Sequence, residues 1–151
     1  MEVKVRVLGL SQLEQGLSEL PRATGKNVLR RVLRQRGEPI AERARNLAPV
    51  DEGHLKDSIG VSTKLSRSQR RKRRKRATVE MFVGPGGHPQ AITQEFGTFF
   101  HPPQPFMRPA WAAEKGSILE DLSGDLWTEI DKAAQRIARK QARLAKKNAG
   151  G

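Results

Sequence analysis

The sequence predicts an α+β fold in which a small antiparallel sheet packs with an N-terminal helix pair and a long C-terminal helix. Three observations support this. Leucines recur at helical spacing early in the chain, two segments near its middle alternate apolar with polar residues, and apolar residues recur every three or four positions from Ala110 onward. A chain of 151 residues is expected to form one domain, here over residues 1–135, followed by a basic tail over 136–151.

The N-terminal segment is predicted to form a strand followed by a short helix. Residues 3–7 alternate valine with a basic residue, which is typical of a strand with one buried face. Ser11 and Glu14 have the spacing of a capping box, and the leucines that follow indicate an amphipathic helix. Pro21 is expected to end this helix.

A second, longer helix is expected to begin near Thr24 as its N-cap and to end before Pro49. Gly37 and Pro39 interrupt its pattern. Because proline removes a backbone donor and clashes with the preceding turn, we expect a kink or a short break there. A short helical turn is predicted next, over residues 52–58.

Two alternating segments, residues 59–65 and 77–84, are predicted to pair as antiparallel strands. The connection between them is a basic arm, residues 64–76, which carries nine basic and no acidic side chains. Such a segment repels itself, so we expect a mobile arm that projects into solvent.

The second half of the chain is predicted to be helical except for two irregular stretches. Residues 84–87 form a glycine-rich loop, and one helical turn over residues 91–96 is expected to end at Gly97. Residues 99–109 are rich in proline and must form an extended connector. The long helix from Ala110 is expected to fray into the basic tail at its end.

The net charge of +13 is concentrated in two segments. Residues 64–76 contribute +9 and residues 132–151 contribute +7, so the remaining residues net −3. The body is therefore nearly neutral and carries two cationic appendages. A hydrophobic fraction of 36% is low for a self-contained globule, which suggests apolar faces that other chains complete.

Several classes of protein are disfavoured by composition. The chain has no cysteine, so it forms no disulfide and no thiolate metal site. Its first ten residues alternate charged with apolar side chains and lack the apolar run of a signal peptide. No run of 18 or more apolar residues indicates a membrane span.

Three motifs occur in a fixed order: L-A-P-V-D-E-G-H-L-K-D-S-I (47–59), Q-E-F-G-T (94–98) and P-F-M-R-P-A (105–110). In this order and at this spacing, the chain resembles the neck or tail-completion proteins of long-tailed bacteriophages over roughly residues 1–130. Mild departures from the family pattern are Glu52 for threonine, Lys56 for arginine and Met107 for leucine. The arm and the basic tail have no counterpart in that pattern.

The resemblance implies a structural virion protein of the phage neck. It would form a homo-oligomeric ring, hexameric, that joins or completes the tail at the head–tail interface and surrounds the DNA channel. Its partners would be head-closure proteins and tail-terminator or tail-tube proteins, with non-specific contact to packaged DNA and no membrane contact. Assembly would take place in the cytoplasm of the host bacterium.

The motif residues have structural interpretations. Asp51 is expected to accept backbone donors at the turn that follows it, Gly97 to adopt a positive φ, and Glu95 to pair with Arg108. Whether the set forms a monomer core or a subunit contact stays open. The predicted structural or subunit-interface residues are Pro49, Asp51, Gly53, Leu55, Ile59, Glu95, Phe96, Gly97, Thr98, Pro105, Phe106, Arg108 and Pro109.

The acidic residues and histidines of the chain raise the alternative of a metal-dependent nuclease. Its candidate ligands and bases are Asp51, Glu52, His54, Asp57, Glu80, His88, Glu95 and His101. They follow none of the established metal-binding spacings, and the loop at residues 84–87 lacks the lysine and hydroxyl of a phosphate-binding loop. We therefore expect no enzyme activity and no cofactor.

The arm has three interpretations. It clamps DNA phosphates, it docks on an acidic neighbouring ring, or it is simply solvated. No aromatic residue is interleaved, so base stacking is disfavoured. The alternative to a neck protein is a nucleic-acid-binding protein of the nucleoid or ribosomal type, which would use both basic segments. The arm's candidate contacts are Arg67, Arg70, Arg71, Lys72, Arg73, Arg74, Lys75 and Arg76.

Overall fold

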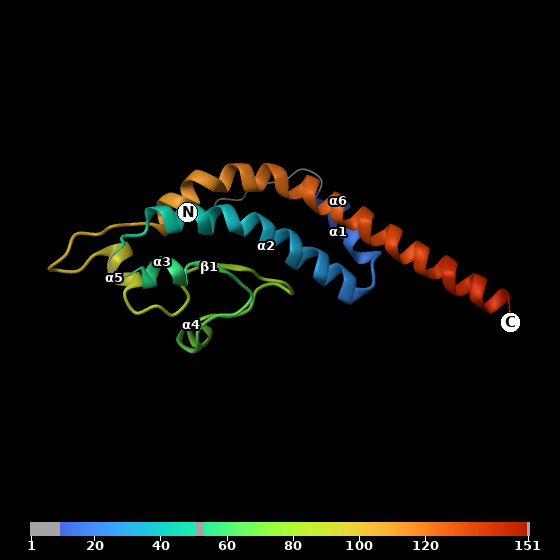
Figure 1. Cartoon of the computed structure of the whole chain (residues 1–151), viewed down its shortest axis with the longest axis horizontal. Helices are drawn as coiled ribbons and strands as arrows, with labels where there is room; N and C mark the ends of the chain where they lie inside the picture. Colours follow the sequence, from blue (N-terminus) through green and yellow to red (C-terminus); the bar gives the residue numbers. More distant parts are fainter. Residues whose placement is uncertain (1–9, 51–52, 151) are drawn as a thin grey trace. The chain divides into compact units, whose positions relative to one another are not determined.

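The computed structural model describes residues 10–50 and 53–150. The predicted strand at residues 3–7 lies outside these residues. The α+β class is confirmed: a two-stranded antiparallel sheet accompanies N-terminal helices and a long C-terminal helix (Figure 1). In chain order the elements are α1 (Leu10–Ser18), α2 (Arg22–Leu47), α3 (His54–Ser58), β1 (Gly60–Ser62), α4 (Arg67–Lys72), β2 (Phe82–Gly84), α5 (Ala91–Phe96) and α6 (Met107–Ala149).

The chain divides into two compact units whose boundaries fall inside α2 and α6. Unit 1 combines α1 and the start of α2, through Val32, with α6 from Leu119 onward. Unit 2 runs without interruption from Leu33 to Ile118. Each unit has its own cluster of buried apolar side chains. The prediction of one domain over residues 1–135 stays a prediction.

Unit 1 is held together by three helices with apolar stripes. The leucine spacing that predicted α1 places Leu13 on its buried face, and Val28 and Val32 do the same for α2. These stripes meet the later part of α6. The buried side chains of this cluster are Leu13, Leu20, Val28, Val32, Leu126, Ile130 and Ala133.

Unit 2 packs the second half of α2 and the start of α6 with the sheet and the short helices. Val61 of β1 and Val83 of β2 are paired in the register and pack against the cluster. The predicted antiparallel pairing is confirmed, although each strand has only three residues. The buried side chains are Ile40, Ala41, Ala44, Ala48, Leu55, Ile59, Ala91, Phe106 and Ala110.

Of the kink or short break expected at Gly37 and Pro39, the break is wrong, because α2 is one helix with Pro39 inside it; the kink stays a prediction. Gly37 does not interrupt the helix either, and its role is in packing. A Cβ at Gly37 would lie 3.1 Å from side-chain atoms of Val61 and Val83, so the missing side chain lets the sheet pack directly on α2.

Predicted helix ends differ from the observed ones in three places. Ser11 lies inside α1 and donates to Gln12 Oε1 at 3.4 Å instead of forming a capping box with Glu14. The second helix begins at Arg22, so Thr24 is not its N-cap. The last helix continues to Ala149, so the segment predicted as a basic tail is helical over residues 136–149.

Within the part of the chain that the structure describes, no helix is both long enough and apolar enough to cross a membrane.

Candidate subunit-contact site

The three sequence motifs converge in the core of unit 2. Leu55 and Ile59 of the first motif are buried in the same cluster as Phe106 and Ala110 of the third. Phe106 is 0% exposed and is one of the largest fully buried side chains of the described chain. The middle motif joins them through Glu95, which is the buried charged residue of this region.

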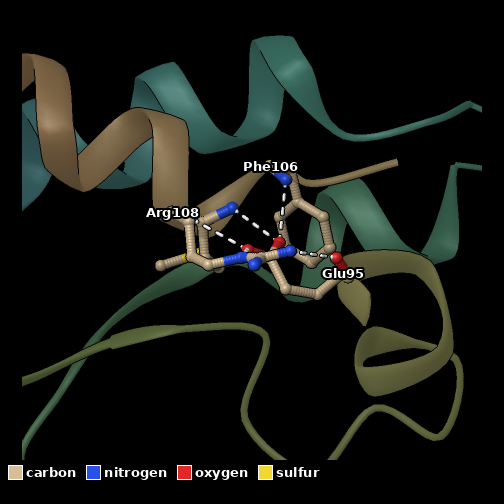
Figure 2. A network of polar contacts seen from close by, with 4 residues as sticks. Glu95, Phe106 and Arg108 are labelled. Carbon is tan, nitrogen blue, oxygen red and sulfur yellow. Dashed lines mark hydrogen bonds and ion pairs between the residues drawn. The ribbon is translucent and has the colours of Figure 1, made fainter. Parts of the chain in front are cut away.

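Glu95 binds the start of α6 (Figure 2). Its carboxylate accepts backbone N–H bonds from Phe106 at 2.8 Å and from Met107 and Arg108 at 2.9 Å. Arg108 Nε donates to the same carboxylate at 3.0 Å, and an Nη of Arg108 donates to the Glu95 carbonyl at 2.8 Å. The predicted pairing of Glu95 with Arg108 is thus confirmed, and the backbone bonds are an addition.

These bonds make Glu95 a cap for α6 supplied from a different helix. The first backbone N–H groups of any helix lack partners within it, and a negative charge at this end is favoured by the helix dipole. Burial raises the pKa of the Glu95 carboxyl, but the backbone bonds and the Arg108 side chain outweigh it, so the net pKa is lowered. Glu95 therefore stays ionised in the folded protein.

The connector turns sharply after α5. Gly97 has φ 76° and ψ 177°, a region open essentially to glycine alone, which confirms its predicted positive φ. A Cβ there would lie 2.7 Å from the Pro103 nitrogen. The Thr98 hydroxyl accepts N–H bonds from Phe100 and His101.

Large apolar side chains stand exposed around this turn. Phe99 is 97% exposed and Phe100 is 84% exposed, with their rings packed edge to face at 5.3 Å between centroids. Ile92 and Phe96 of α5 are 72% and 62% exposed. We call these four residues the connector surface. Phe96 lies under Arg108, whose Cζ is 4.7 Å from the ring centroid, whereas Phe106 is buried.

The remaining motif residues flank this core. Pro49 follows the end of α2, and Gly53, with φ 83°, holds the N-cap position of α3 without a side-chain cap bond. Asp51, predicted to cap that turn, lies outside the described residues. Pro105 is exposed, whereas Pro109 sits half-buried in the first turn of α6, a place where a helix tolerates proline.

Part of the basic arm forms a short helix. Residues 67–72 form α4, which has no buried residue. Its N-terminus is a complete capping box: Ser66 Oγ accepts from the Gln69 amide at 3.3 Å, and Gln69 Oε1 accepts from the Ser66 amide at 3.0 Å. The charge pattern gave no sign of this helix, although the S-x-x-Q spacing of Ser66 and Gln69 indicates one; that the arm is mobile and projects into solvent stays a prediction.

Glu80 closes the base of the arm. Arg73 donates two hydrogen bonds to its carboxylate, at 2.8 and 2.7 Å, and the Arg76 and Ala77 amides donate to it as well. The side-chain bond from Arg73, helped by the backbone bonds, lowers the pKa of Glu80 to about 2. One of the arm's candidate DNA contacts, Arg73, is therefore already paired within the chain.

Of the candidate catalytic residues, only His54 and His88 are found to line one hollow within the part of the chain that the structure describes. Glu95 and Glu80 are bound by arginine and backbone donors, and the hollow that His54 and His88 line, of about 260 Å³, lies beside α5. Residues 10–50 and 53–150 contain no group of three or more histidines and acidic residues placed to hold a metal ion. Asp51 and Glu52 lie outside those ranges.

Comparison with known protein families identifies the chain. A family model described as "Bacteriophage HK97-gp10, putative tail-component" matches residues 11–97, which is more than half of the chain. The chain belongs to the HK97-gp10-like family. It is a structural component of the bacteriophage tail, where it interacts with other tail proteins. Comparison with curated proteins and with solved structures gave no match.

The match shows which part of this chain is shared with the family. It extends from α1 to Gly97, so it includes the first motif and nearly all of the second. The third motif and α6 follow it. The resemblance recognised in the sequence, over roughly residues 1–130, is thus confirmed at the level of the family, over a shorter stretch of chain.

Proposed function

We propose that this tail component is a non-enzymatic subunit that forms a closed ring, hexameric, at the junction between head and tail, with a channel for DNA. Its partners are the head-closure proteins on one side and the tail-terminator or tail-tube proteins on the other. Assembly takes place in the cytoplasm of the host. Closed cyclic symmetry suits a component needed in a fixed copy number, because it leaves no unpaired end.

The observation that carries the proposal is the connector surface. Phe99 and Phe100 expose nearly all of their apolar area to solvent, and such area is favourable to bury. The loop that holds them is fixed at both ends, by the Gly97 turn and by the Glu95 bonds to Phe106. A prearranged apolar projection of this kind is suited to a neighbouring subunit, because little freedom is lost on binding.

The test is assembly with and without the connector surface. The purified chain alone is expected to be monomeric or weakly associated, and to form rings with its neck partners, seen by light scattering and electron microscopy. The double variant Phe99→Ser, Phe100→Ser should keep its circular dichroism spectrum and lose ring formation. Leu144→Ser, which changes a 51% exposed residue of unit 1, is the matched control and should form rings normally.

Two results would contradict the proposal. One is a wild-type chain that stays monomeric with every neck partner and never enters the particle. The other is a double variant that assembles as well as the control. Removal of residues 67–76 should leave rings intact, whereas a protein of the nucleoid or ribosomal type would lose its function with the arm.

A further inference from the structure

A cationic groove runs along unit 1 between the first half of α2 and the later part of α6. Two neighbouring hollows, of about 370 Å³ and about 310 Å³, share Arg31 and Arg136 in their walls. Thr24 and Asn27 add polar groups on the α2 side. The cations that line the two hollows are Arg31, Lys132, Arg136, Arg139 and Lys140.

The acidic side chain in this lining is that of Glu129, and it binds two of the cations. Glu129 accepts from Arg31 at 2.6 Å and from Lys132 at 3.1 Å. Arg136 Nε donates to the Lys132 carbonyl at 3.2 Å, which holds its guanidinium along the helix. The carboxylate therefore orients two cations but neutralises only part of the lining, since five cations face one anion.

The groove continues as a stripe along α6. Three- and four-residue steps place Arg136, Lys140, Arg143 and Lys147 on one side of the helix, flanked by Arg139 and Lys146. From Lys132 to Lys147 this side is about 22 Å long. No acidic residue interrupts it between residues 132 and 150.

We propose that this groove and stripe bind the phosphate backbone of DNA. Duplex DNA carries about one negative charge per 1.7 Å of its axis, so a stripe of this length faces enough phosphates to engage all of its cations. A protein partner would instead call for an apolar or aromatic anchor among the charges. The apolar residues that line the hollows, Val28, Ala133 and Ile137, belong to the core of unit 1 or pack against it, and no aromatic residue lines either hollow. The inference rests on the proposed function in one respect: the proposed ring supplies the DNA channel.

The experiment compares two double variants with equal loss of charge. Arg136→Gln, Lys140→Gln removes two cations from the groove. Arg22→Gln, Lys26→Gln removes two from α2, outside the lining of both hollows and, at 100° per residue, on the side of α2 away from Arg31. Binding of each full-length chain to a fluorescent DNA duplex is measured between about 50 and 200 mM salt.

The groove variant is expected to bind roughly 50-fold more weakly at about 0.1 M salt and to lower the salt slope by about 2, because each phosphate contact contributes about 0.9. The α2 variant should bind like wild type. Equal losses in the two variants, or unchanged binding in the groove variant, would overturn the inference. So would binding of inorganic phosphate or of polyglutamate with the same dependence on Arg136 and Lys140.

Failure of this inference can be told apart from failure of the proposed function. The groove variant should still form rings with the neck partners. If the chain forms rings but its DNA binding does not depend on the groove, the inference is wrong and the proposed function stands. If DNA binding depends on the groove but the chain never forms rings, the proposed function is wrong and the inference stands.

Discussion

Two carboxylates, Glu95 at the start of α6 and Glu80 at the base of the arm, make nearly the same bonds in different surroundings. Each accepts backbone N–H groups and an arginine side chain. Each of those arginines also covers a phenylalanine ring, Arg108 at 4.7 Å and Arg73 at 4.6 Å. Glu95 is 5% exposed and belongs to the core of unit 2, whereas Arg73 and Glu80 are joined near the surface.

The comparison shows that burial, more than the pattern of bonds, decides what such a cluster stabilises. At Glu95, lost bonds would leave buried N–H groups without partners, which is costly. At Glu80, water replaces any lost bond, so the cluster orders a local segment without greatly stabilising the fold. Three experiments test this difference, and a fourth tests the turn that follows Glu95.

The largest effect is expected from Glu95→Ala. It leaves the amides of Phe106 and Met107 without their acceptor and should lower the free energy of unfolding by about 3–5 kcal/mol. Urea unfolding followed by circular dichroism measures the loss. Glu120→Ala, at an exposed position of α6, should change stability by less than about 0.5 kcal/mol. Similar losses in both variants would contradict the capping role of Glu95.

Gly97→Ala should cost about 3 kcal/mol. The new Cβ would lie 2.7 Å from the Pro103 nitrogen and 2.9 Å from the His101 carbonyl oxygen, in a backbone conformation that other residues avoid. Thermal unfolding provides the measurement. Gly116→Ala, inside α6 with open space around it, should instead stabilise by up to about 1 kcal/mol. A Gly97 variant as stable as wild type would show that the turn adapts.

Low pH should remove the difference in stability between the wild-type protein and the variant Glu95→Gln. The pKa of this carboxyl is lowered from its ordinary 4.5, so its contribution is complete above that pH and is lost as the pH falls through the folded value. The difference in urea midpoint between wild type and Glu95→Gln should therefore narrow from neutral pH to below pH 4.5. A constant difference over that range would mean that the charge of Glu95 contributes nothing.

The smallest change in global stability is expected from Glu80→Gln. The variant weakens the link to Arg73, so the Arg76 and Ala77 amides should exchange hydrogen faster while the urea midpoint stays unchanged. Exchange at the Phe106 amide serves as the internal control. In wild type, acid should have the same local effect between pH 4.5 and about 2, because protonated Glu80 loses its preference for Arg73. A large shift in the urea midpoint would show that Glu80, like Glu95, stabilises the whole fold.

Local patterns allowed much of the fold to be predicted. The leucine spacing of α1, the helical turn that ends at Gly97 and the antiparallel pairing of β1 with β2 all depend on residues close together in sequence. The pairing of Glu95 with Arg108 also followed from the motifs, since the two are separated only by a short connector.

Other features depended on contacts that a linear pattern does not contain. Pro39 predicted a kink or a short break, yet α2 continues through it, and Val61 and Val83 pack directly on Gly37 nearby. Phe96 and Phe106 look alike in sequence, yet Phe106 is buried and Phe96 is exposed beneath Arg108. Even the capping box at Ser66, which is local, was hidden by the overwhelming charge of the arm.

The sequence by itself determined the family, the helical stripes and the concentration of positive charge in two segments, because each is a property of residue order alone. Only the tertiary structure decided that Glu95 caps a helix begun twelve residues later, and that Arg31 of α2 meets Arg136 of α6 along one groove. Hydrogen bonds and charge clusters act over a few ångströms of space, and the fold alone brings distant segments within that range.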